Sequence, residues 1–207
     1  MSEDLELGHH TVEIAMVRHA TTAWSGRRYC GRSDPQLTAA GRAEAVALAR
    51  RLAPTLDPDT RLVSSPARRA AATAAAIAAA LGDIAIQLDP RWMETYFGDV
   101  EGLGFDELAA RHPELAQAIL DGETAIDWPG GETAAAFTAR VTSAWHELAE
   151  AARPVVVVTH AGPILYAMRL ARNGVAGLSD VPEPATEVRL AIGIQGADRR
   201  AVLPSPA

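Results

Sequence analysis

Two histidines and three arginines occupy the positions in this sequence that could do chemistry. Arg18 and His19 directly follow a short apolar run, and His160 follows a second one. Arg68 and Arg69 open an alanine-rich helical stretch just after a third run. A guanidinium presents a planar fork of donors that fits phosphate oxygens, and a neutral imidazole can attack phosphorus. If they are brought together, these residues suit a dianionic phosphate group.

The runs before these residues predict three strands of one sheet. Residues 14–17 and 155–158 are short apolar runs bounded by polar or small residues, as buried strands of a parallel sheet are, and residues 61–65 form a third short strand around Leu62 and Val63. In open α/β sheets, ligand chemistry gathers just beyond the carboxyl ends of the strands. If the three strands are parallel neighbours, the histidines and arginines meet at one edge of the sheet.

The rest of the pattern predicts a three-layer α/β sandwich, with helices on both faces of a mostly parallel central sheet of about five or six strands. Helices are expected over residues 38–53, with Thr38 as N-cap, 67–81, 108–120 with an interruption at Pro113, 133–151 and 164–172. Further strands are expected over 85–88, at an edge, and 187–194. Residues 1–207 are expected to form one domain, with residues 1–10 and 199–207 as mobile tails.

Composition limits the classes of function. The 207 residues are 48% hydrophobic and 22% charged, an ordinary globular balance. The net charge of −7 argues against a broad surface for nucleic acid or an anionic membrane. The single cysteine, Cys30, excludes an intrachain disulfide and a cysteine-rich zinc site. The acidic first residues lack the pattern of a signal peptide and no run approaches the ~20 apolar residues that cross a bilayer, so a cytoplasmic protein is expected.

Four separated motifs resemble the histidine phosphatase superfamily, the phosphoglycerate-mutase-like proteins. They are Arg18-His19-Ala20-Thr21-Thr22-Ala23-Trp24-Ser25, Ser65-Pro66-Ala67-Arg68-Arg69-Ala70 with Thr73-Ala74, the segment from Glu94 to Gly102, and Thr159-His160-Ala161-Gly162. Shorter matches at 30–34, 37–38, 41 and 131–133 extend the resemblance over most of the chain. It implies a phosphoglycerate-mutase-like fold and hydrolysis of a small phosphorylated metabolite, with no metal and no cofactor.

The resemblance also implies roles for individual residues. His19 is the expected nucleophile, which forms a phosphohistidine while its other ring nitrogen donates to a fixed acceptor such as a backbone carbonyl. His160 is expected to donate to a phosphoryl oxygen. Glu94 is the expected general acid and then general base. Arg18 and Arg69 are expected to bind the phosphoryl oxygens.

Further positions match family positions near phosphate or substrate. These are Thr22, Ser25, Gly31, and the backbone N–H groups of Ala161 and Gly162. The chain departs from the family pattern where Ala20 and Ala161 replace common glycines, Thr21 replaces a common glutamate and Ser25 replaces a common asparagine.

Three roles have rivals within the same motifs. Arg68 competes with Arg69, and the motif spacing favours Arg69. Glu101 competes with Glu94, and we expect Glu101 to form hydrogen bonds within its own loop. Glu132 is expected either to contact substrate or to cap the long helix that follows it.

Two other functions remain open. One is a 2,3-bisphosphoglycerate-dependent phosphoglycerate mutase, although such mutases usually carry a longer insertion than the 28 residues, 103–130, between Gly102 and Gly131. The other is a catalytically silent module that binds a phosphate ligand. The compact loops are similar to those of small-metabolite phosphatases, including α-ribazole-phosphate phosphatase. The substrate and the oligomeric state are not predicted.

Overall fold

A five-stranded sheet forms the centre of the part of the chain that the computed structural model describes, residues 10–172 and 174–194. Its strands are β1 (His10–Arg18), β2 (Arg61–Ser64), β3 (Ile86–Leu88), β4 (Val155–Thr159) and β5 (Glu187–Ile194), in the order β3-β2-β4-β1-β5. β1 to β4 are parallel, and β5 is antiparallel to β1. The predicted mostly parallel sheet is confirmed. The predicted tails lie outside the described residues, apart from His10, which begins β1 and does not belong to a tail.

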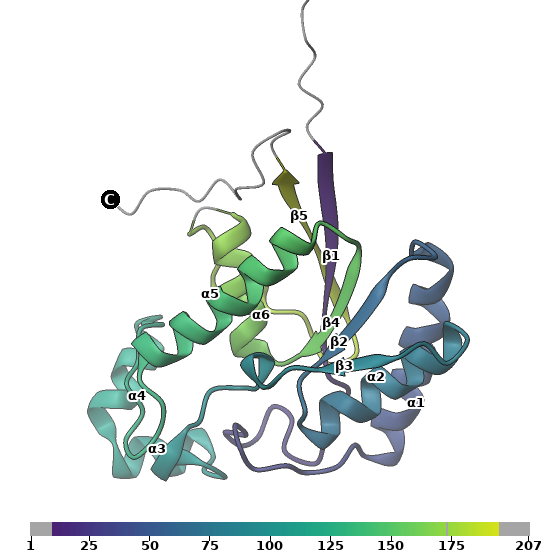
Figure 1. The fold of residues 1–207 in the computed structure, drawn as a ribbon. Coiled ribbons are helices and arrows are strands. Elements are labelled where there is room, and N and C mark those ends of the chain that lie inside the picture. Colours follow the sequence, from purple (N-terminus) through teal and green to yellow (C-terminus); the bar gives the residue numbers. More distant parts are fainter. Residues whose placement is uncertain (1–9, 173, 195–207) are drawn as a thin grey trace, which may run out of the picture.

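Helices cover both faces of the sheet, which gives the predicted three layers (Figure 1). One face carries α1 (Ala39–Leu52) and α2 (Arg68–Ala80), and the other carries α5 (Ala134–Ala151) and α6 (Ala161–Ala171). Two short helices, α3 (Phe105–Arg111) and α4 (Pro113–Leu120), lie to one side, near the start of α5. Single 3-10 turns cover Ala53–Thr55, Pro90–Trp92, Gly98–Val100 and Leu178–Asp180.

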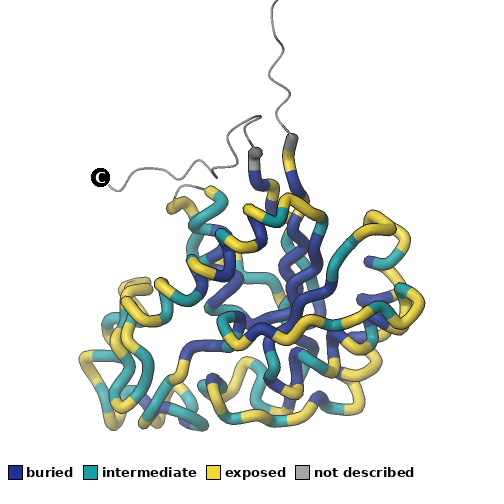
Figure 2. Tube along the Cα trace, viewed as in Figure 1, coloured by how far each residue is buried: buried dark blue, intermediate teal, exposed yellow. Residues whose placement is uncertain are grey.

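Alternation along β1 supplies both halves of the hydrophobic core. Ile14 and Met16 pack in the cluster under α5 and α6, whereas Ala15 and Val17 pack in the cluster under α1 and α2. Successive side chains of a strand point to opposite faces, so a strand covered on both sides must be apolar at every position. Figure 2 shows these strands as a buried centre inside a more exposed shell.

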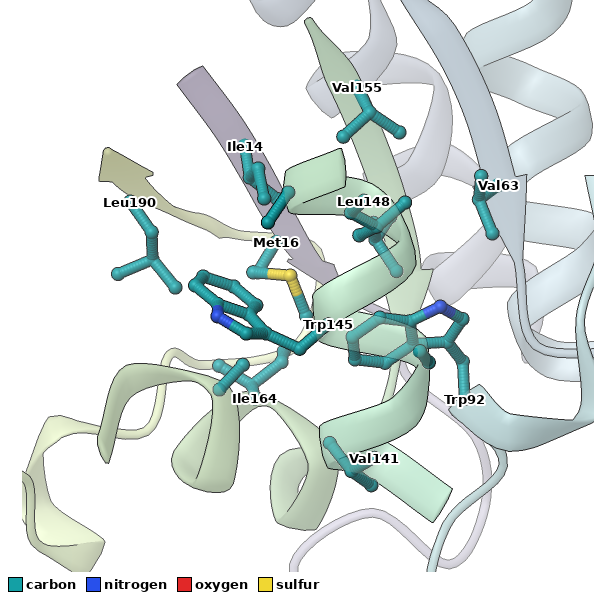
Figure 3. Close-up of a cluster of buried hydrophobic side chains, with 14 of the residues drawn as sticks. Ile14, Met16, Val63, Trp92, Val141, Trp145, Leu148, Val155, Ile164 and Leu190 are labelled. Carbon is teal, nitrogen blue, oxygen red and sulfur yellow. The ribbon is translucent and has the colours of Figure 1, made fainter. Parts of the chain in front are cut away.

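The two core clusters differ in the size of their side chains. Small residues of α2, among them Ala70 and Ala74, face the sheet on one side. On the other side the cluster contains larger groups, including Trp145 of α5 and Trp92 (Figure 3). Trp92 lies in the loop after β3 and is fully buried. Its insertion into the core fixes the start of the loop that continues to Glu94.

Capping explains where the helix boundaries agree with the sequence pattern and where they do not. The Thr38 side chain accepts the N–H of Gly41 and caps α1, as predicted. α6 begins at Ala161, three residues before the predicted start. Pro163 lies in its first turn, where backbone N–H groups have no partner within the helix and proline is tolerated. α3 likewise begins at Phe105 and not at Leu108, directly after Gly104.

Candidate active site

The carboxyl ends of β2, β4 and β1 lie side by side because these strands are adjacent and parallel. His19 follows β1 and His160 follows β4, and their ring centroids are 5.1 Å apart in an edge-on arrangement. Ser65 follows β2, and its Oγ lies 2.8 Å from Nε2 of His160. The predicted meeting of the two histidines at one sheet edge is confirmed.

His19 is held in a single tautomer. Its Nδ1 lies 2.8 Å from the carbonyl oxygen of Ala20. A carbonyl oxygen can only accept, so Nδ1 carries the ring proton and Nε2 keeps its lone pair. Burial and the positive charges of Arg69 and Arg18 lower the pKa of His19 from 6.5 to about 3. The ring is therefore neutral near pH 7, which is the state that a nucleophilic nitrogen requires.

His160 is also neutral, because full burial and the charge of Arg69 hold its pKa well below the usual value. The Oγ of Ser65 accepts the N–H of Ala67 at 3.4 Å, and its own proton can go to Nε2 of His160. In that arrangement the ring proton of His160 lies on Nδ1. Nδ1 is buried and has no hydrogen-bond partner within the described residues.

Arg69 is buried, whereas Arg68 extends into solvent with 72% of its side chain exposed. The terminal nitrogens of Arg69 donate to the carbonyl oxygens of Cys30, Gly31 and Ser33 at 2.8–3.1 Å. Arg69 therefore fastens the loop of residues 30–34 to the start of α2. Its Nε is buried and makes no hydrogen bond among the residues described.

Arg18, at the end of β1, has a similar arrangement. Its terminal Nη1 donates to the carbonyl oxygen of Pro182 at 3.0 Å. Its Nε is buried, and no partner for it exists in the described part of the chain. The positive charges of both Arg18 and Arg69 lower the pKa of each histidine.

Glu101 joins two loops, whereas the prediction was hydrogen bonds within its own loop, which only the bond from Phe97 fulfils. Its carboxylate accepts backbone N–H groups from Gly31, Arg32, Ser33 and Phe97 at 2.8–3.3 Å. These bonds tie residues 31–33 to the loop after Glu94. A Cβ on Gly31 would lie 1.9 Å from the carbonyl oxygen of Thr95, so no larger residue fits there without a shift of the main chain.

Thr22 and Ser25 close the turn after β1. The backbone N–H of Thr22 donates to Oγ of Ser25 at 3.0 Å, and the two hydroxyl oxygens are 3.2 Å apart. The N–H of Trp24 donates to Oγ1 of Thr22. Both hydroxyls therefore support the turn, and Thr22 is buried.

Glu94 is buried, with its carboxylate fixed by backbone donors. The N–H of Thr95 donates to one oxygen at 2.9 Å, and the N–H of Gly162 donates to the other at 3.2 Å. The resemblance implies that the Gly162 N–H faces a phosphoryl oxygen, but in the structure it is bound to Glu94. A Cβ on Gly162 would lie 2.4 Å from a Glu94 oxygen. The start of α6 therefore positions the Glu94 carboxylate, through the backbone N–H of Gly162, which lies two residues after His160 in the chain.

Arg140 of α5 holds the main chain around Glu94, a role that the motifs do not indicate. It donates to the carbonyl oxygens of Arg91 and Met93 at 2.7 Å and of Glu94 at 3.2 Å. It also forms a two-bond pair with the carboxylate of Glu132 at 2.6 and 2.8 Å. These five bonds use all five N–H groups of a guanidinium. The sequence contains one indication of this role: Arg140 is a charged residue between Phe137 and Val141, on the apolar face of a predicted helix.

Glu132 does not cap α5, so that alternative is wrong. The cap is Thr133, whose side chain accepts the N–H of Ala136. Burial opposes ionisation of Glu132, but the hydrogen bonds and charge of Arg140 outweigh it and keep the pKa of the carboxyl below its usual value. Glu132 is therefore the ionised partner of Arg140.

A cavity of about 300 Å³ adjoins Glu94. Its wall includes Ala161, Gly162 and five aromatic side chains, Tyr29, Phe97, Trp128, Phe137 and Tyr166. A larger cavity of about 860 Å³ lies near the amino ends of β1 and β4. None of the candidate residues belongs to its described lining, so the smaller cavity is the one connected to the site.

Cys30 lies beside the site but is not a second nucleophile. Burial raises the pKa of its thiol to about 11, so the thiolate is scarce near pH 7.

Within residues 10–172 and 174–194, no group of three or more histidine, cysteine or acidic side chains is arranged to hold a metal ion. No helix among the described residues is long and apolar enough to cross a membrane.

Comparison with known proteins identifies the family of this chain. A sequence model of the histidine phosphatase superfamily (branch 1) matches residues 14–185. The chain is 34% identical over 167 residues to Phosphoglycerate mutase-like protein 4 of Arabidopsis thaliana, a match that covers 79% of this chain and 70% of that protein. It is 32% identical over 165 residues to Metal-independent phosphoserine phosphatase of the same plant, covering 78% of this chain and 69% of that protein.

The fold is similar to solved structures as well. A mycobacterial glucosyl-3-phosphoglycerate phosphatase superposes with a TM-score of 0.77 at 29% sequence identity. That superposition covers 88% of this chain and 91% of the other. The likeness therefore extends over most of the fold.

Proposed function

The chain belongs to the histidine phosphatase superfamily, and from that premise we propose that it hydrolyses phosphomonoesters of small metabolites through a phosphohistidine on His19. One observation carries the proposal. His19 is buried and neutral, and the Ala20 carbonyl fixes its proton on Nδ1, which leaves the Nε2 lone pair free beside His160 and two arginines.

Three buried nitrogens support the binding of a phosphoryl group. They are Nε of Arg18, Nε of Arg69 and Nδ1 of His160, each without a hydrogen-bond partner among the described residues. Buried polar groups in proteins are nearly always satisfied, and phosphoryl oxygens are strong acceptors for charged donors. The three donors stabilise the negative charge that spreads over the equatorial oxygens in the transition state.

In the first step, Nε2 of His19 attacks phosphorus, and the bond from phosphorus to the ester oxygen breaks. Glu94 gives its proton to that oxygen, so the product leaves as a neutral alcohol. The phosphoryl group stays on His19 as a phosphohistidine. Glu94 is suited to this part because its oxygens are fixed by Thr95 and Gly162 and border the cavity beside the site.

In the second step, water attacks the phosphohistidine. Glu94, now ionised, takes a proton from the water, and the bond between nitrogen and phosphorus breaks. Inorganic phosphate leaves, Nε2 of His19 regains its lone pair, and Glu94 is again protonated. The cycle needs only side chains of this protein and consumes one water molecule.

The names of relatives support a hydrolase that needs no metal. One relative is called a metal-independent phosphoserine phosphatase, and a similar solved structure is a glucosyl-3-phosphoglycerate phosphatase. We propose likewise that this protein acts without a metal or organic cofactor, and that it does so in the cytoplasm, where phosphorylated metabolites are held.

The test is hydrolysis of p-nitrophenyl phosphate in excess EDTA by the wild type, His19→Ala and His146→Ala. His146 is a half-buried histidine of α5 outside the site and provides the matched control. We expect turnover in the wild type and in His146→Ala, and loss of at least about 1,000-fold in His19→Ala. Equal turnover in all three proteins would contradict the proposal. Conversion of 3-phosphoglycerate to its 2-isomer with 2,3-bisphosphoglycerate, without net hydrolysis, would indicate a mutase.

A further inference from the structure

We propose that the preferred substrate is a phosphomonoester of an alcohol that carries a flat aromatic group, and that this group occupies the cavity beside Glu94. The inference rests on the proposed function, because Glu94 is there the acid that protonates the leaving oxygen. The leaving alcohol must then lie on the Glu94 side of the phosphoryl group. Glu94, Ala161 and Gly162 all belong to the cavity wall, so the cavity begins where the leaving oxygen has to be.

Aromatic side chains dominate the wall of this cavity. Tyr29, Phe97 and Trp128 form one group, with ring centroids 4.6–5.6 Å apart in tilted or edge-on geometry. Phe137 and Tyr166 form a second group at 5.9 Å. All five rings are only half-buried, so apolar surface remains to be covered. Offset or edge-on contact with a further ring is the arrangement that such surfaces favour.

Aliphatic side chains complete the apolar wall. Ile119 of α4, Ile126 of the following loop and Leu165 of α6 also belong to the lining. A volume of about 300 Å³ is at the lower end of the range for small-molecule sites, about 300–1,000 Å³. The cavity therefore suits a group of one or two rings.

The charges in the wall disfavour acidic substrates. Its described lining contains the carboxylates of Glu94 and Glu123 and a single cation, Arg169. The guanidinium of Arg169 already donates to the carbonyl oxygen of Ala176 and to the hydroxyl of Thr124. A substrate carboxylate, as in phosphoglycerate or phosphoserine, would therefore meet the carboxylate of Glu123, and the one cation of the described lining already has two of its five N–H groups engaged.

The experiment compares 2-phenylethyl phosphate with ethyl phosphate. Both esters release a primary alcohol, so the difference in rate reports contact with the ring and not the chemistry of the leaving oxygen. We expect kcat/KM about 10- to 100-fold higher for the phenylethyl ester, the factor for removing one such side chain from water. We also expect 3-phosphoglycerate to be hydrolysed no faster than ethyl phosphate. Equal kcat/KM for the two alkyl esters would overturn the inference.

Two variants locate the effect in the cavity. Trp128→Ala should lower kcat/KM for the phenylethyl ester about 5- to 10-fold and leave that for ethyl phosphate within about 2-fold. Tyr96→Ala is the matched control, because Tyr96 is a 40% exposed aromatic residue of the neighbouring loop and is not part of the cavity lining. Equal effects of the two substitutions on the phenylethyl ester would argue against the cavity.

Binding of phosphonates separates this inference from the proposed function. In 3-phenylpropylphosphonate and propylphosphonate a CH₂ group replaces the ester oxygen, so both bind without turnover. Tighter calorimetric binding of the phenyl compound, lost in Trp128→Ala, would support the aromatic cavity whether or not the protein hydrolyses any ester. If no ester were hydrolysed, that result would reject the proposed function and leave the cavity in place. Equal phosphonate affinities together with equal hydrolysis of both alkyl esters would reject the cavity and leave the proposed function in place.

Discussion

Replacing Arg140 with lysine tests whether the main chain that carries Glu94 must be held for proton transfer. The guanidinium makes five hydrogen bonds, two to Glu132 and three to the carbonyl oxygens of Arg91, Met93 and Glu94. A lysine ammonium has three donors on one nitrogen and cannot span both sets. At least two bonds are lost, and each bond to a charged donor contributes about 1.5–3 kcal/mol.

The kinetic effect should depend on the leaving group. General acid catalysis contributes about 10²–10⁴-fold, and a displacement of about 1 Å can cost 10²-fold, so we expect kcat/KM for 2-phenylethyl phosphate to fall about 10- to 100-fold in Arg140→Lys. p-Nitrophenyl phosphate releases a stable phenolate that needs no proton, so its kcat/KM should change by no more than about 3-fold. Glu94→Gln should show the same split with a larger amplitude.

A matched control separates positioning from general stability. Arg91→Lys alters an arginine of the same loop whose guanidinium contacts Asp89 and Glu147 and not the carbonyl oxygens near Glu94. It should leave the ratio of the two substrates unchanged, and thermal melting of each variant should show that it is folded at the assay temperature. Equal losses on both esters in Arg140→Lys, or no loss on the phenylethyl ester, would refute the positioning role.

Three further predictions follow from the same geometry. The folded-state pKa of His19 is lowered to about 3, so between pH 6.5 and 3 the unfolded chain binds a proton that the folded chain does not. The free energy of unfolding should therefore fall with decreasing pH, by at most about 1.4 kcal/mol per pH unit for this group. Urea denaturation at several pH values should show that the free energy of unfolding of His19→Gln depends less steeply on pH than that of the wild type. Glu101→Gln replaces one of the two accepting oxygens with an NH₂ donor, so at least one of the four backbone N–H groups loses its acceptor and the remaining bonds lose the negative charge; this should destabilise the fold by about 2–4 kcal/mol in urea denaturation, whereas an unchanged midpoint would contradict the role assigned to that carboxylate. Gly162→Ala places a Cβ 2.4 Å from a Glu94 oxygen and should lower kcat for alkyl phosphates by about 10-fold or more; retention of wild-type kcat would show that the carboxylate tolerates displacement.

The sequence predicts the parts of the fold that depend on local patterns. The Thr38 cap, the alanine-rich α2 and the continuous apolar runs of β1 and β4 are readable because capping and burial act on neighbouring residues. The bounds of β5 agree with the predicted strand over residues 187–194. Its antiparallel pairing with β1 is not readable, because no local signal fixes the direction of a strand relative to a partner far away in the chain.

The same distinction applies to the site. The motifs bring His19, His160 and Glu94 into view, and the sheet places both histidines at one edge. The Arg140 contacts span 46–49 residues along the chain, and they end on carbonyl oxygens, which no residue type reveals. The donor from Gly162 to Glu94 is hidden for the same reason, since it depends on α6 starting three residues earlier than its apolar pattern suggests.

The most direct measurement of the central claim is isolation of the phosphoenzyme. The wild type is mixed with ³²P-labelled substrate, quenched in alkali within the first turnover and digested, and the labelled peptide is identified. The account predicts an acid-labile, alkali-stable phosphoryl group on the peptide that contains His19, and no label in His19→Gln. Label on another residue, or no label although alcohol is released before phosphate, would contradict it.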